Sequence, residues 1–305
     1  MLTRSRPALA VLGVAALAVL GGCGSAAESA RPAPSSTPGA ASPMDKRHQL
    51  EAAKADCMKQ QGFKYVPHVT SQGPETEESR KRTSGDYQAL RKYREKYGFG
   101  VFAMHVYPKE MGNPQVKPDD AEIDPNWKIQ TGLSEAQTKA YRKAKDTCMT
   151  TAVGQVLGLK VKSEMDLYNA QNRAMNRALK SAINGDPDMV ELAAAMATCL
   201  KGKGYTVGDT SPVAMNESGQ KAFLAQEDKL GREQLDDVPD VAPPVKDGEL
   251  PMTYAPTLTP EQARPYLAKE IKAALDDLEC GKDFYRAYMP KQAAIIQQIS
   301  DQYGT

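Results

Sequence analysis

The pattern of apolar and polar positions changes sharply near the start of the chain. Residues 8–20 form one continuous apolar run, whereas from residue 45 onward apolar side chains recur every three or four positions. The second pattern is typical of helices that bury one face. It predicts helices over residues 85–97, 163–183 and 282–303, the last kinked at Pro290, and a helix carrying Cys199.

Three long stretches lack a helical period and are expected to be irregular loops: residues 64–84, 106–132 and 206–257. Residues 98–107, GFGVFAMHVY, are the one stretch that hints at a strand. The sequence therefore predicts a mostly α fold with long irregular loops and little or no sheet.

One phrase occurs twice, as DCMKQQGFKY at residues 56–65 and as TCLKGKGYTV at residues 198–207. Leucine and alanine precede each cysteine by seven and four positions, so Cys57 and Cys199 are expected to close an apolar helical stripe. A glycine follows each cysteine at the fifth position. Gly62 and Gly204 are predicted to end the two helices, because glycine adopts the left-handed conformation without a steric penalty.

An aromatic residue follows each of these glycines and is expected to pack back on its own helix, Phe63 on Met58 and Tyr205 on Leu200. These structural roles explain almost every shared feature of the two phrases. The phrases are therefore interpreted as scaffolding rather than as thiol nucleophiles or metal ligands.

A second phrase also recurs, as LSEAQTKAY at residues 133–141 and as LTPEQARPY at residues 258–266. Each has a hydroxyl residue followed three positions later by glutamine, which is the spacing of a helix capping box. The two pairs are Ser134 with Gln137 and Thr259 with Gln262. Each phrase therefore predicts the start of a helix that runs on to a cysteine, Cys148 or Cys280.

The two repeats divide the chain into helical unit 1, residues 45–160, and helical unit 2, residues 161–305, which pack either as one domain or as two. The four cysteines of these units suggest two disulfides, and no CxxC motif points to zinc or thioredoxin-type chemistry. Pairing within units is favoured, as Cys57–Cys148 and Cys199–Cys280. The alternative, Cys57–Cys280 with Cys148–Cys199, stays open.

The N-terminal residues have the features of a lipoprotein signal peptide over residues 1–22. Two arginines precede the apolar run, which is shorter than the roughly 20 residues that span a bilayer. The run ends in Leu-Gly-Gly-Cys, so Cys23 is expected to become the lipidated N-terminus, carrying palmitate or a similar acyl chain. The Ser-, Ala- and Pro-rich residues after it, to residue 44, are expected to form a disordered tether. The alternative is an ordinary signal peptide with a chance cysteine.

The charge balance limits the partners of the mature chain. The sequence has 39 basic and 38 acidic side chains, and loss of Arg4 and Arg6 with the signal leaves 37 basic against 38 acidic, a net charge of −1. Nucleic acid and anionic lipid headgroups call for a basic surplus. Membrane attachment is therefore expected through the N-terminal lipid, on the outer face of the cell membrane, and no nucleic-acid partner is expected.

Recognised catalytic motifs are missing from the sequence. It has no HExxH, GxSxG, Walker A or GxGxxG motif, and its three histidines are far apart. DDAEID at residues 119–124 lacks the glycine and glutamate of a calcium loop, and DDLEC at residues 276–280 is interpreted as an exposed face. No metal, cofactor or catalytic residue is therefore predicted.

The one tryptophan, Trp127, is expected to lie in a loop. It is interpreted as a core anchor or, with Tyr107, as part of a ligand groove.

Several stretches together resemble an uncharacterised family of actinobacterial exported lipoproteins. They are the lipobox Cys23, CMKQQGF, YREKYGFGV, DPNWKIQTGLSEAQTKAYRKA, CLKGKGY and LTPEQA…ALDDLEC. The chain departs from the family at Asp56 and Thr198, where an aromatic residue often precedes the cysteine. The resemblance implies an envelope accessory role beside a partner such as an export ABC transporter or a sensor kinase, and it implies no activity.

The leading hypothesis is a lipid-anchored, non-enzymatic envelope protein that binds a partner protein or a cell-wall component. The alternative is a solute-binding lipoprotein of an ABC transporter, a class that needs lobes of alternating strands and helices. A cell-wall hydrolase is the third hypothesis, and it needs an activated acid, thiol or metal that the sequence does not offer.

Overall fold

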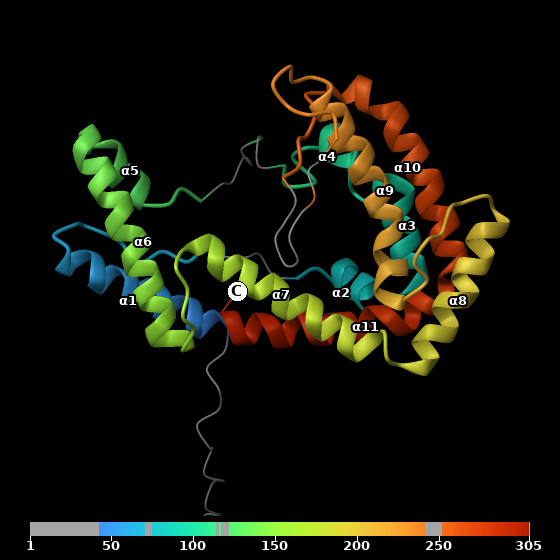
Figure 1. The fold of residues 1–305 in the computed structure, drawn as a ribbon, viewed down its shortest axis with the longest axis horizontal. Helices are drawn as coiled ribbons and strands as arrows, with labels where there is room; N and C mark the ends of the chain where they lie inside the picture. The colour runs from blue at the N-terminus through green and yellow to red at the C-terminus, as the bar shows by residue number, and fades with distance from the viewer. Residues whose placement is uncertain are drawn as a thin grey trace, which may run out of the picture. The chain divides into compact units, whose positions relative to one another are not determined.

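The computed structural model describes residues 43–70, 75–113, 116, 122–241, 244 and 252–304, which fall within one compact unit. The signal peptide, Cys23 and nearly all of the tether lie outside the described residues. The described residues are mostly helical and include no strand, in agreement with the predicted fold class. Their helices (Figure 1) are α1 Pro43–Gln60, α2 Glu77–Thr83, α3 Tyr87–Tyr97, α4 Ala103–Val106, α5 Asn126–Thr131, α6 Glu135–Leu157, α7 Glu164–Ile183, α8 Pro187–Gly202, α9 Pro212–Arg232, α10 Pro260–Cys280 and α11 Lys282–Tyr303.

Local sequence signals set several helix boundaries. Ser134 and Thr259 each begin a helix with a complete capping box, closed by Gln137 and Gln262. Each hydroxyl accepts the glutamine's backbone N–H, and each glutamine side chain accepts the backbone N–H of the capping residue. These reciprocal bonds satisfy donors that a helix start otherwise leaves without partners.

The two repeated cysteine helices, α1 and α8, end in the same hydrogen-bonded turn. Phe63 N donates to Met58 O over 2.9 Å, and Tyr205 N donates to Leu200 O over 3.0 Å. Gly62 and Gly204 have φ angles of 79° and 87°. Only glycine takes this conformation readily, which explains why both helices stop at these positions.

The structure pairs Cys57 with Cys148 and Cys199 with Cys280, the within-unit pairing that the sequence favours. The first disulfide joins α1 to α6, which pack side by side (Figure 1). The second joins α8 to α10. A disulfide that closes a loop of this length stabilises the fold by about 4.5 kcal/mol in the loop-entropy model.

The prediction that Cys199 closes an apolar buried stripe is wrong for α8. Ala195 and Cys199 are exposed, and the buried face of this helix includes Met196 and Leu200. The cysteine therefore lies at the edge of the packed face, where its sulfur reaches the neighbouring helix, while the next residue enters the core. In α1 the residue after the cysteine, Met58, is likewise fully buried.

The irregular loops expected over residues 64–84, 106–132 and 206–257 each contain a helix: α2, α5 and α9. The longest of these unpredicted helices is α9. Its residues Asn216, Ser218 and Gly219 have low helix propensity, so propensity alone disfavours a helix there. Packing supplies the missing stability. Phe223 of α9 packs with Phe102 and with the ring of Phe99 in the turn after α3.

The indication of a strand over residues 98–107 is also wrong, because this stretch forms turns and the short helix α4. Glu270 of α10 accepts the backbone N–H groups of Val101 and Phe102 over 2.9 and 2.8 Å. A buried carboxylate thus takes the place of the neighbouring strand that would otherwise satisfy these donors. Through these contacts α3 and α4, which belong to helical unit 1 by sequence, pack on α10 of helical unit 2.

Candidate functional site

A cleft of about 360 Å³ lies among α2, α3, α9 and α11. Its volume is within the range of small-molecule sites, roughly 300–1,000 Å³. The lining combines two guanidinium groups, three side-chain amides, hydroxyls and a wall of apolar and aromatic residues. The lining residues are Ser79, Arg82, Thr83, Leu90, Tyr93, Arg94, Gly98, Phe99, Asn216, Gln220, Tyr285, Met289 and Gln292. We call it the Arg82 cleft.

Two glycines allow the elements around the Arg82 cleft to pack closely. Gly85 has a φ of +80°, and a Cβ there would lie 2.6 Å from the Tyr285 carbonyl oxygen, so the turn between α2 and α3 packs directly against α11. Gly98 has a φ of +60°, and a Cβ there would lie 2.7 Å from Cγ of Glu270. Both positions therefore require glycine for backbone and for space.

Arg94, which lines the cleft, forms a buried ion pair with Asp277 of α10. The Nη1 atom of Arg94 donates to Asp277 Oδ1 over 2.5 Å and to the Ala274 carbonyl over 2.8 Å. The Tyr285 hydroxyl donates to the same Asp277 oxygen over 2.6 Å. Burial raises the pKa of the Asp277 carboxyl, and both Arg94 and Tyr285 oppose that rise. This network holds α3, α10 and α11 together beside the cleft.

Arg82 differs from Arg94 because no carboxylate among the described residues pairs with it. Its guanidinium lies 4.3 Å from the ring centroid of Tyr93, a stacked cation–π arrangement. Its Nε atom is buried and has no hydrogen-bond partner among the described residues. Burial raises the pKa of the Tyr93 hydroxyl, and Arg82 opposes the rise.

A second pocket, of about 220 Å³, lies on the other side of Phe99 and is mainly apolar. Its lining includes Leu200, Tyr205, Val207 and Phe223, and Asp277 also reaches it. Phe99 lines both pockets.

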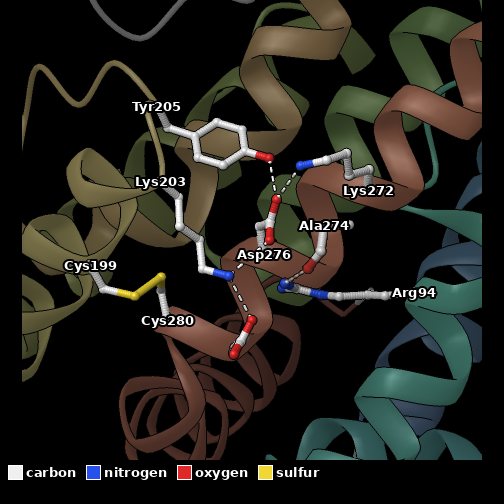
Figure 2. Close-up of polar contacts among 9 residues, drawn as sticks. Arg94, Cys199, Lys203, Tyr205, Lys272, Ala274, Asp276 and Cys280 are labelled. Carbon is white, nitrogen blue, oxygen red and sulfur yellow. Dashed lines mark hydrogen bonds and ion pairs between the residues drawn. A yellow bond between two sulfur atoms is a disulfide. The ribbon is translucent and has the colours of Figure 1, made fainter.

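Beside the second disulfide, Asp276 is surrounded by three donors (Figure 2). It accepts hydrogen bonds from Lys272 over 2.8 Å, Tyr205 over 2.7 Å and Lys203 over 2.9 Å. These bonds, led by that from Lys272, hold the pKa of Asp276 well below its usual range. Lys203 also pairs with Glu279. DDLEC was expected to be a merely exposed face, but its carboxylates tie α10 to the turn that ends α8.

Tyr107 and Trp127, the two aromatic residues proposed together as a groove, have different surroundings. Tyr107 packs edge-on against Tyr97 in the cluster around Phe102. Trp127 lies on α5 and is 63% exposed, so the core-anchor interpretation is wrong. Its neighbour Ile129 faces the separate cluster around Met58 and Tyr141. Trp127 is exposed because Asn126, beside it, takes the buried position and bonds both backbone groups of Val66.

One histidine lies closer to an acid than the sequence suggests. His105 Nε2 is 2.7 Å from Glu227 Oε1, and both line a pocket of about 300 Å³ between α4 and α9. Within the described part of the chain, no group of three or more His, Cys, Asp or Glu side chains is placed to hold a metal ion.

Sequence reasoning did not find the residues of the Arg82 cleft. Arg82 belongs to a basic run inside a predicted loop, and Asn216 and Gln220 belong to the helix α9 that the sequence did not reveal. The one usable signal is Gly85–Asp86, a turn glycine followed by a capping aspartate, which marks the junction of α2 and α3.

Comparisons with known proteins assign no family: no family model matches the chain, and neither a curated protein nor a solved structure is significantly similar to it. None of the helices in the described residues is both long enough and apolar enough to span a membrane.

Proposed function

We propose that this chain is a lipid-anchored protein of the cell envelope that binds a ligand or partner and does not catalyse a reaction. The proposal joins two features. The N-terminal residues have the pattern of a lipoprotein signal ending at Cys23, and the folded part has a cleft lined by recognition groups.

The lining of the Arg82 cleft is the observation that carries the binding role. Guanidinium, amide and hydroxyl groups surround an apolar wall, which is how proteins orient small molecules without reacting with them. The alternative, a solute-binding lipoprotein of an ABC transporter, gains no support from the described helices, because that class is built on alternating strands and helices.

The anchored role is tested by metabolic labelling of cells with an alkynyl palmitate analogue. The native chain should incorporate the label and fractionate with membranes, whereas Cys23→Ser should do neither. Equal labelling or equal membrane association of the two chains contradicts anchoring through Cys23. Cross-linking of the native chain in intact cells then identifies its neighbours. A dominant transporter or sensor kinase indicates an accessory subunit, and cell-wall fragments indicate glycan binding.

A further inference from the structure

Among the described residues, Arg82 is a partly buried cation with an unsatisfied hydrogen-bond donor. Its Nε is buried without a hydrogen bond, although buried donors in folded proteins almost always have one. Stacking on Tyr93 holds the guanidinium in place, and its Nε–H stays without a partner among the described residues. The fold therefore positions the guanidinium of Arg82 and leaves one of its donors, Nε–H, unsatisfied.

The carboxylates near Arg82 are engaged elsewhere. On α2 itself, Glu77 pairs with Lys81, and Glu78 pairs with Lys92 of α3. Asp277, which lines the neighbouring pocket and not the cleft, is paired with Arg94. None of the described residues that line the cleft is an aspartate or a glutamate. The cleft therefore offers positive charge and amide donors with no acid of its own.

We propose that the Arg82 cleft binds a small molecule through an oxyanion, a carboxylate or a phosphate group. A planar guanidinium matches either group with two parallel hydrogen bonds. Asn216 and Gln220 from α9, and Gln292 from α11, supply further amide groups around the cleft. This inference rests on the proposed binding role and names its ligand class.

The rest of the lining indicates what the oxyanion is attached to. Leu90, Phe99 and Met289 provide apolar surface beside the polar groups. The volume of about 360 Å³ suits one small molecule and not a polymer. The ligand is therefore expected to carry a short apolar or aromatic moiety next to its anionic group.

The test uses the folded, disulfide-bonded chain and three probes of similar shape. Benzoate and phenyl phosphate carry the two oxyanions, and benzamide is the neutral counterpart of benzoate. Titration calorimetry measures affinity, and thermal unfolding measures the shift in Tm with each probe. We expect at least one anion to bind saturably and to raise the Tm, at an affinity about tenfold or more above that of benzamide. Which anion binds distinguishes a carboxylate ligand from a phosphate ligand.

Two variants locate the binding. Arg82→Gln removes the cation, and Asn216→Asp adds a negative charge to the lining with almost no change in shape. Each should weaken anion binding about tenfold or more. Arg80→Gln is the matched control, because Arg80 is an exposed arginine on the same short helix, and it should bind as the native chain does. Circular dichroism and the Tm without probe establish that each variant is folded, and Asn216→Asp keeps the test decisive if Arg82→Gln unfolds α2.

The proposal is overturned if neither anion binds more tightly than benzamide. It is also overturned if folded Asn216→Asp and Arg82→Gln bind the anions as the native chain does, because the binding would then lie elsewhere. Either result leaves acylation at Cys23 and the cross-linked neighbours unaffected. Conversely, loss of anchoring with intact anion binding rejects the envelope role and retains the oxyanion site.

Discussion

The Phe99 ring occupies the space that a side chain at Gly219 would need: a Cβ built on Gly219 would lie 2.3 Å from Cζ of Phe99. Phe99 follows α3, and Gly219 lies in the middle of α9. Glycine normally weakens a helix interior, by about 1 kcal/mol relative to alanine. Here it allows an aromatic ring, which lines both pockets, to pack against the helix backbone.

Gly219→Ala is expected to destabilise the chain by about 1–3 kcal/mol, because the methyl group displaces Phe99 and overrides the gain in helix propensity. Gly154→Ala in α6 is the matched control. A Cβ there meets nothing closer than 3.7 Å, so that variant should be more stable by about 0.5–1 kcal/mol. Urea unfolding measures both changes. Stabilisation by Gly219→Ala would show that Phe99 moves aside without cost.

The same pair of residues explains which parts of the fold were predictable. Capping boxes and glycine stops act within four to six residues, so Ser134 with Gln137, and Gly204 with its turn, follow from the sequence alone. α9 depends instead on contacts with Phe99 and Phe102, which come from a distant part of the chain. Propensity favours a loop at Gly219, and tertiary packing overrides it.

The candidate site was unpredictable for a related reason. Arg82 can be recognised as a candidate binding residue only once the nearby acids are seen to pair with lysines. That pairing depends on how the helices are formed and packed. The disulfides were predictable in part. The duplicated phrases favoured pairing within units, and the structure has that pairing. The packing of α3 and α4 on α10, however, could not be predicted from the pattern of apolar positions.

The two disulfides should differ in resistance to reduction. Cys148 is fully buried against Met58 and Tyr141, whereas Cys199 is exposed. A reducing thiolate must reach a sulfur to attack it. Limited treatment with dithiothreitol, followed by alkylation and peptide mapping, should therefore label Cys199 and Cys280 before Cys57 and Cys148. The reverse order would contradict the burial of the first disulfide.

Removing either disulfide should lower the free energy of unfolding by a similar amount. The bonded cysteines are 91 residues apart in the first disulfide and 81 in the second. Both lengths give about 4.5 kcal/mol in the loop-entropy model. The variants are Cys57→Ala with Cys148→Ala, and Cys199→Ala with Cys280→Ala, compared by urea unfolding. A much larger loss for one pair would mean that its sulfurs also contribute packing.

Glu270→Gln should destabilise the fold although it removes a buried charge. Both carboxylate oxygens accept backbone N–H groups, one from Val101 and one from Phe102. An amide presents an NH₂ group to one of those donors and leaves it unsatisfied, at a cost of about 1–3 kcal/mol. Glu279→Gln, an exposed position on the same helix, should cost far less. Equal costs in urea unfolding would show that the turn after α3 does not depend on Glu270.

Asp276→Asn should remove a pH-dependent part of the stability. Lys272, Tyr205 and Lys203 all donate to this carboxylate, and they hold its pKa below that of an unfolded aspartate. A group whose pKa is lower in the folded state stabilises the fold above its unfolded pKa of about 4 and loses that contribution as the pH falls toward the folded value. At neutral pH the variant should lose about 1 kcal/mol, a modest amount because solvent screens the lysines.

Urea unfolding from pH 7 down to pH 3 measures this dependence. The difference in unfolding free energy between the native chain and Asp276→Asn should be constant near neutral pH and should shrink as the pH falls below about 4, because the native carboxylate gradually loses its advantage over the neutral amide. Asp283→Asn is the control, because Asp283 pairs with Arg286 at an exposed surface and should contribute little at any pH. A difference that stays constant down to pH 3 would mean that the hydrogen bonds stabilise α8 against α10 without favouring the charged form of Asp276.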